Sequence, residues 1–185
     1  MDVFDLPQIL RHNARFDLTK LQWLNGEYIR DLSADRFYEL SVHALARAGI
    51  DTNPFPLAYV KAALDTCLGK VKLFSELPGY AGFYFVEEVS CDTEAAQKLF
   101  TPEAKPHLLK LRDALNQLTV FDAPTLETTL KDIARQLGIK PAALVHPVRL
   151  ACTGKGAGPS LYHLLEVLGR TRVLQRLDRA LTRVA

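Results

Sequence analysis

Residues 14–30 read ARFDLTKLQWLNGEYIR, and this stretch combines a helix start with an apolar period of helical length. Asp17 is placed to accept backbone N–H groups from a first helical turn. The large apolar residues that follow recur at helical spacing: Leu18, Leu21, Leu24 and Tyr28, with Trp23 on the flank. We therefore expect an amphipathic helix whose stripe, Leu21 and Leu24 above all, packs against a core.

Similar signals for helix starts and helix ends continue along the whole chain. Ser33 can cap a helix that Gly49 closes, and Asp122 can cap one that Gly138 ends. Prolines fall near several helix starts, where a missing N–H does little harm. Expected helices after the first lie at 33–49, 56–68, 70–85, 94–100, 103–118, 124–137, 141–150, 159–168 and 170–183, the last two separated by Gly169. The 70–85 helix should be interrupted or bent around LPGYAG, where Pro78, Gly79 and Gly82 fall. The pattern predicts an all-α fold.

Two features of this organisation leave room for alternatives. The end of the 70–85 segment, GFYFVEEV, is rich in aromatic and β-branched residues, so a short strand competes there with the favoured helix. The texture then becomes polar and acidic near Ser90. We place a boundary there, between a connecting helical subdomain at 1–89 and a distal helical subdomain at 92–185.

Bulk composition is that of a folded protein without a membrane span. The 185 residues are 48% hydrophobic and 24% charged, and no apolar run approaches 18 residues. No secretory signal is visible at the start, and three cysteines, Cys67, Cys91 and Cys152, lie too far apart for a zinc-binding pattern. We expect reduced, mostly buried thiols, no metal site and a cytoplasmic protein.

Charge is distributed unevenly along the chain. Residues 135–185 hold nine Lys plus Arg and two acids, a net charge of +7, whereas the remainder carries −5. A basic region on a chain with a net charge of +2 is what a phosphate-facing surface would show, although a solvated helix face collects arginines too.

A glycine-rich stretch lies inside this basic region, within HPVRLACTGKGAGPSLYHLLEVLGRTRVLQRLDRAL at residues 146–181. Gly154, Gly156 and Gly158 allow tight turns and close approach to a ligand, and backbone amides ahead of the next helix can bind a phosphate or a base edge. Arg149 precedes this loop and Lys155 lies in it. The order of residues differs from a phosphate-binding P-loop and no strand precedes it, so the competing interpretation is a structural helix connector.

Three ordered segments resemble bacterial-type glutamyl-tRNA synthetases: FDLTKLQWLN, KLFSELPGYAGFYF and the 146–181 stretch. The last is similar to the C-terminal pattern of that family through Pro147, Arg149, Ala151, Thr153, Gly154, Pro159, Leu161, Leu168, Gly169, Arg176, Leu177, Ala180 and Leu181. The resemblance covers nearly the whole chain. It implies two packed helical subdomains of a class I aminoacyl-tRNA synthetase that bind the anticodon of the glutamate tRNA.

The resemblance also implies particular contacts. Arg149 and Leu161 match family positions that contact anticodon bases, and a base-contacting threonine of the family falls on Gly158. Lys70 matches a second basic reading position, where some relatives carry arginine, whose two parallel donors lysine lacks. Splayed anticodon bases suit such contacts, because their edges are free. Lys155, Arg170 and Arg172 are candidate phosphate contacts.

The sequence carries no arrangement suited to catalysis. The HIGH-like and KMSKS-like motifs of such enzymes are missing, and no nucleophile with a base is convincingly placed. We expect no catalytic residues and no cofactor for this chain, with ATP and Mg serving the parent ligase, and a monomer whose partner is the glutamate tRNA. The rival hypothesis is a free-standing helical scaffold that binds a protein partner through an apolar groove, and its support is Phe83, Tyr84 and Phe85, which could form an exposed aromatic patch. DNA binding by a helix-turn-helix is weaker, since no helix shows a compact base-reading face.

Overall fold

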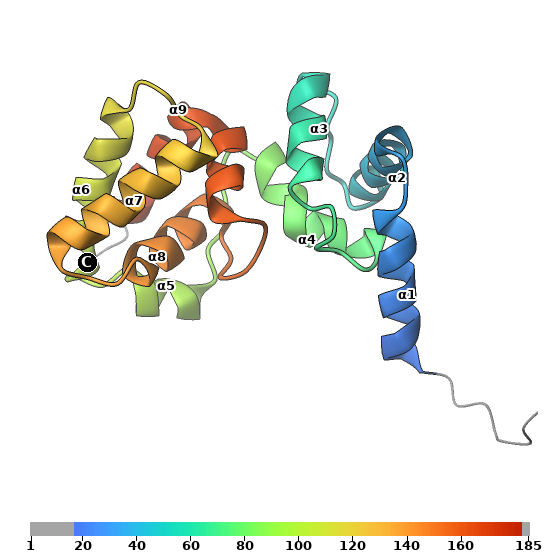
Figure 1. Cartoon of the computed structure of the whole chain (residues 1–185), viewed down its shortest axis with the longest axis horizontal. Helices are drawn as coiled ribbons and strands as arrows, with labels where there is room; N and C mark the ends of the chain where they lie inside the picture. The colour runs from blue at the N-terminus through green and yellow to red at the C-terminus, as the bar shows by residue number, and fades with distance from the viewer. Residues whose placement is uncertain (1–16, 183–185) are drawn as a thin grey trace, which may run out of the picture.

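The computed structural model describes residues 17–182, and every regular element in that range is helical (Figure 1). The α-helices are α1 (Leu18–Arg30), α2 (Ala34–Arg47), α3 (Leu57–Asp65), α4 (Leu77–Ala81), α5 (Thr93–Leu99), α6 (Ala104–Gln117), α7 (Ala123–Leu137), α8 (Ala142–Thr153) and α9 (Leu161–Thr182). Two 3₁₀ helices flank α4, at η2 (Phe74–Glu76) and η3 (Gly82–Phe85). The all-α prediction is confirmed.

Local capping chemistry explains where these helices begin. The predicted caps Asp17, Ser33 and Asp122 each accept a backbone N–H three residues ahead, at 3.0, 3.3 and 2.9 Å. Such a bond satisfies one of the N–H groups that a first turn leaves without a helical partner. Gly169 has non-helical angles of φ 77° and ψ 158°, so α9 consists of two helical parts that this residue separates, as predicted.

The helices form two groups along the molecule (Figure 1). One contains α1 to α4, and the other packs α5 to α8 around α9, which also contacts α3. A single buried cluster runs through both groups, from Ile29 on α1 to Leu181 on α9. The chain passes between the groups after Phe85. The subdomain limits at 89 and 92 therefore remain a prediction, since the continuous core gives no separate cores to divide.

The apolar stripe of α1 is exposed, so the expectation that it packs against a core is wrong. Leu21 and Leu24 are 47% and 42% exposed, and Leu18, Trp23 and Tyr28 more so. The helix packs instead through Gly26 and Ile29, which are buried, and through the Asn25 side chain, which donates to the carbonyl of Lys72. Periodicity correctly identified the helix but not which side of it meets the rest of the protein.

In the segment 70–85 the favoured helical prediction is confirmed over residues 74–85, and the competing strand is absent there. The helical run is interrupted as expected, because η2, α4 and η3 follow one another in place of one regular α-helix, and residues 71–73 before it have no regular structure. Its aromatic end is deeply buried: Phe83, Tyr84 and Phe85 are 7%, 0% and 8% exposed. Neighbouring rings from α3 and the turn before it pack edge-on against them. The exposed aromatic patch on which the scaffold hypothesis relied is therefore absent at these three residues.

Candidate nucleic-acid interface

Arg149 lies on the last turns of α8, half-buried, with its side chain against the turn that precedes α9. Its Nη1 donates to the carbonyl of Pro159 at 2.7 Å. Burial lowers the pKa of the Arg149 guanidinium from its ordinary value, but arginine stays protonated at physiological pH. Because its partner is a neutral carbonyl rather than a carboxylate, the positive charge is held in place without being cancelled.

The glycine-rich turn after α8 is packed against other backbone at its first glycine and has free space at a later one. Gly154 has φ 74°, and a Cβ added there would lie 2.2 Å from the carbonyl oxygen of Ser90. The absence of a side chain at position 154 thus lets the segment at Ser90–Asp92 approach closely, and the Asp92 N–H donates to the Gly154 carbonyl at 3.2 Å. A Cβ on Gly156 would meet nothing within 4 Å. Close approach to a ligand remains possible only beyond Gly154.

The other residues matched to base-reading positions differ in accessibility. Gly158 lies beside Arg149, since a Cβ on it would be 3.5 Å from Arg149 Nη1. Leu161 is only 4% exposed and belongs to the core, so in this conformation its side chain offers almost no surface to a base. Lys70 is exposed in the turn after α3, and among residues 17–182 no hydrogen bond or ion pair joins it to Arg149. The structure thus places Gly158 beside Arg149, whereas Lys70 belongs to a turn after a different helix.

The three candidate phosphate contacts all donate to groups of their own chain. Lys155 Nζ reaches the carbonyl of Gly79 at 2.8 Å, and Arg170 donates to the carbonyl of Leu118. Arg172 donates at 2.9 Å to the Tyr59 hydroxyl and to the Tyr84 carbonyl. Each partner is neutral, so these cations still contribute positive potential while holding neighbouring segments together. Their contacts with phosphate remain predictions.

Arg176 has a structural role that was not predicted from the sequence. It is 3% exposed and donates to the carbonyls of Cys152, Phe83 and Val86. Burial lowers its pKa from the ordinary value. By joining α9 to α8 and to the end of η3, one guanidinium ties the two groups of helices together. A buried arginine in a basic helix leaves no distinguishing local signal, because its partners come from far along the chain.

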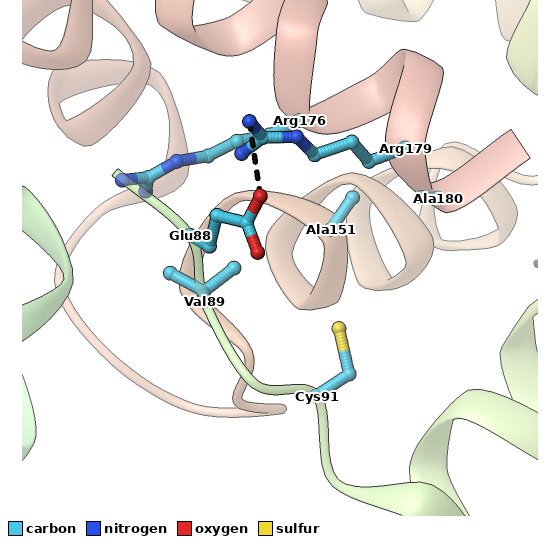
Figure 2. A pocket seen from close by; sticks show the side chains of 7 residues that line it. All are labelled: Glu88, Val89, Cys91, Ala151, Arg176, Arg179 and Ala180. Carbon is cyan, nitrogen blue, oxygen red and sulfur yellow. Dashed lines mark ion pairs between the residues drawn. The ribbon is translucent and has the colours of Figure 1, made fainter. Parts of the chain in front are cut away.

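A small cavity beside Arg176 is shown in Figure 2. Glu88 and Arg179 form an ion pair of 3.2 Å at its edge, and Cys91 points toward it from the opposite side. Its free volume of about 20 Å³ has room for one water molecule and not for a nucleotide. This cavity is therefore not a candidate for the RNA site.

A larger groove lies between α3 and α9, and the sequence did not predict it. It measures about 610 Å³ and is lined by Ala62, Asp65, Thr66, His163, Glu166 and Val167. We call it the α3–α9 groove. The lining residues follow helical spacing on both helices, but two faces that meet only in the folded chain cannot be paired from sequence periodicity.

The cysteines match the expectation of buried thiols in two of three cases. Cys67 and Cys152 are fully buried, and burial raises their thiol pKa values to about 11 and about 12. Cys91 is half-buried, and its thiol lies 3.6 Å from the carbonyl of Leu150. Within residues 17–182 no group of His, Cys, Asp and Glu side chains is arranged to hold a metal ion. No described helix is both long enough and apolar enough to cross a membrane.

A family model described as "Anticodon binding domain" matches residues 36–181, which include Arg149, the glycine-rich turn and the α3–α9 groove. The chain belongs to this anticodon-binding domain family. The match begins within α2 and so leaves α1 outside it.

Curated relatives agree with that membership. The chain is 37% identical to a glutamate–tRNA ligase of Methylacidiphilum infernorum over 94% of its own length. It is 30% identical to glutamate–tRNA ligase 2 of Caldicellulosiruptor saccharolyticus over 97% of its length. It spans only 39% and 37% of these two proteins. The relatives therefore contain a larger part that has no counterpart in the 185 residues.

Solved structures show the same fold. A glutamate tRNA ligase from Elizabethkingia meningosepticum, in complex with its amino acid, superposes with a TM-score of 0.82 at 21% identity. The match covers 98% of this chain and 36% of that one. Glutamate-tRNA synthetase from Elizabethkingia anophelis gives a TM-score of 0.78 at the same identity. The arrangement of helices is thus one that such ligases contain.

Proposed function

We propose that this chain binds the anticodon loop of the glutamate tRNA and acts as the part of a glutamate–tRNA ligase that selects the tRNA. The family match over residues 36–181 carries the proposal. The position of Arg149 supports it, because a half-buried guanidinium beside an open glycine turn has donors that its single contact with Pro159 does not use. Unstacked loop bases present the acceptors that such donors recognise.

Electrostatics supports the same function. Arg149, Lys155, Arg170 and Arg172 all have neutral partners, so the basic C-terminal third keeps its positive potential. Positive charge that its own acids do not cancel attracts a phosphate backbone. In this proposal the loop of the RNA lies over the turn at residues 155–160. Catalysis with ATP and Mg belongs to the part of the relatives that this chain does not match.

The test is the affinity of Arg149→Ala for an RNA hairpin that carries the glutamate anticodon. We expect a loss of about 1–3 kcal/mol, since one base-reading arginine is removed. Arg149→Lys should recover only part of that loss, because lysine keeps the charge without the two parallel donors. Fluorescence anisotropy at several salt concentrations measures both effects.

The matched control is Arg47→Ala. Arg47 is exposed at the end of α2 and its removal changes the net charge equally. Wild-type binding should weaken steeply as salt rises. Equal affinities of Arg149→Ala, Arg47→Ala and the wild type would contradict the assigned role of Arg149, and salt-independent binding would favour a protein-docking scaffold.

A further inference from the structure

The α3–α9 groove contains an unpaired acid, Glu166, which belongs to the basic C-terminal third of the chain. Only two acids, Glu166 and Asp178, lie among residues 135–185. Asp178 accepts from Nε and Nη2 of Arg112 at 2.8 and 3.0 Å. Glu166 is exposed and makes no hydrogen bond or ion pair with any residue in the range 17–182. In a region of net charge +7, a carboxylate left unpaired at a groove is available to a ligand.

The groove adjoins the Arg149 site through the turn before α9. Arg149 donates to the carbonyl of Pro159, and the hydroxyl of the next residue, Ser160, lies 3.0 Å from Nδ1 of His163 in the groove wall. On the opposite wall, the Thr66 hydroxyl lies 3.0 Å from the Tyr84 hydroxyl. A nucleotide that contacts Arg149 can therefore place its neighbour in the groove.

The chemistry of the walls narrows what the groove can accept. Ala62 and Val167 give it apolar surface, and about 610 Å³ is ample for a nucleobase. Asp65 and Glu166 disfavour a phosphate by like-charge repulsion. The Asp65, His163 and Glu166 side chains are not arranged to hold a metal ion. With phosphate and metal ions disfavoured, the ligand that best suits these walls is a flat, partly apolar group that donates hydrogen bonds.

We propose that the α3–α9 groove takes one splayed base of the bound loop, and that Glu166 accepts a hydrogen bond from the exocyclic amino group of that base. This inference rests on the proposed RNA-binding function and names a specificity residue for it. Cytosine presents an amino group where uracil, a base of the same size, presents a carbonyl oxygen. A carboxylate can only accept, so it attracts the first and repels the second.

The experiment compares RNA hairpins that differ only by cytidine or uridine at each central loop position. At one position the wild type should bind the cytidine hairpin about tenfold more tightly, the scale of one hydrogen bond to a charged group. Glu166→Gln should bring that ratio to about twofold or less, because an amide can turn to donate to uracil as well as accept from cytosine. The substitution is on the surface, and thermal unfolding checks that the fold is retained.

Glu94→Gln is the control, since Glu94 is an exposed acid on α5 and its loss changes the net charge equally. It should leave the cytidine-to-uridine ratio unchanged. The inference is overturned if the wild type shows no such preference at any position, or if Glu166→Gln tightens both hairpins equally, as a simple charge effect would.

The same measurements separate the two proposals. If Arg149→Ala weakens binding while Glu166→Gln leaves the base preference intact, the RNA-binding function stands and the role of Glu166 fails. If the wild type binds no hairpin better than a duplex without a loop, the proposed function is wrong and this inference falls with it.

Discussion

Helices α1 and α7 carry the same local signals but meet different surroundings. Each begins at an aspartate that accepts a first-turn N–H, Asp17 at 3.0 Å and Asp122 at 2.9 Å. Each has leucines at helical spacing. Leu126 and Leu130 of α7 are 1% and 2% exposed, however, whereas the α1 stripe lies open to solvent. Amphipathic periodicity therefore identifies a helix with an apolar face, but whether that face is covered depends on which elements surround it.

The surroundings differ because of how each helix is placed. α7 contacts α6, α8 and α9, so three elements are available to cover its leucines. α1 lies at the end of the other group and contacts the chain through Gly26, Ile29 and the segment near Lys72 (Figure 1). The two regions should therefore respond differently to substitution in solution.

The largest effect is expected from Arg176→Met, which removes the most deeply buried of the cationic side chains that join the two groups of helices. The carbonyls of Cys152, Phe83 and Val86 lose their donor, and the first two belong to buried residues, so we expect a loss of about 3–5 kcal/mol in the free energy of unfolding. With that anchor gone, the α1–α4 group should unfold before the α5–α9 group. Urea titration followed by far-UV circular dichroism measures both the loss and the appearance of two transitions. A single, unshifted transition would mean that Arg176 does not link the two regions.

A paired substitution compares the two stripes directly. Leu130→Ala in α7 should cost about 2–5 kcal/mol, because it leaves a cavity in a packed interior. Leu21→Ala in α1 should change stability by no more than about 0.5 kcal/mol, since that side chain is already half in water. Urea midpoints of both variants give the comparison. A loss at Leu21 as large as that at Leu130 would show that the α1 stripe is covered in solution.

The smallest effect is a pH dependence located at the start of α7. Hydrogen bonds from Thr125 lower the pKa of the Asp122 carboxyl below its ordinary value. A carboxyl with a lowered pKa in the folded state contributes stability above its unfolded pKa of about 3.9 and loses it as pH falls through the folded value. Wild-type stability should therefore decline slightly in acid. Asp122→Asn, which retains the cap without the charge, should reduce that decline in acid-titrated thermal unfolding; an unchanged decline would assign it to other carboxyls.

The cationic residues show where sequence reasoning was sufficient and where it was not. The basic C-terminal third and the candidate role of Arg149 were predictable from charge and from family resemblance. The partners of Lys155, Arg172 and Arg176 were not, because each reaches a backbone carbonyl contributed by residues far away in sequence. The α3–α9 groove was equally hidden, since Thr66 and Glu166 become neighbours only when α3 packs beside α9.

Helix starts, helix ends and the all-α class followed from the amino acids alone, because a cap, a glycine or a helical period acts within a few residues of backbone. The openness of the α1 stripe, the burial of Leu161 and the use of arginines as ties between segments arose only on folding. Burial and long-range hydrogen bonding depend on which surfaces come to face each other, and the local signals in the sequence do not specify that pairing.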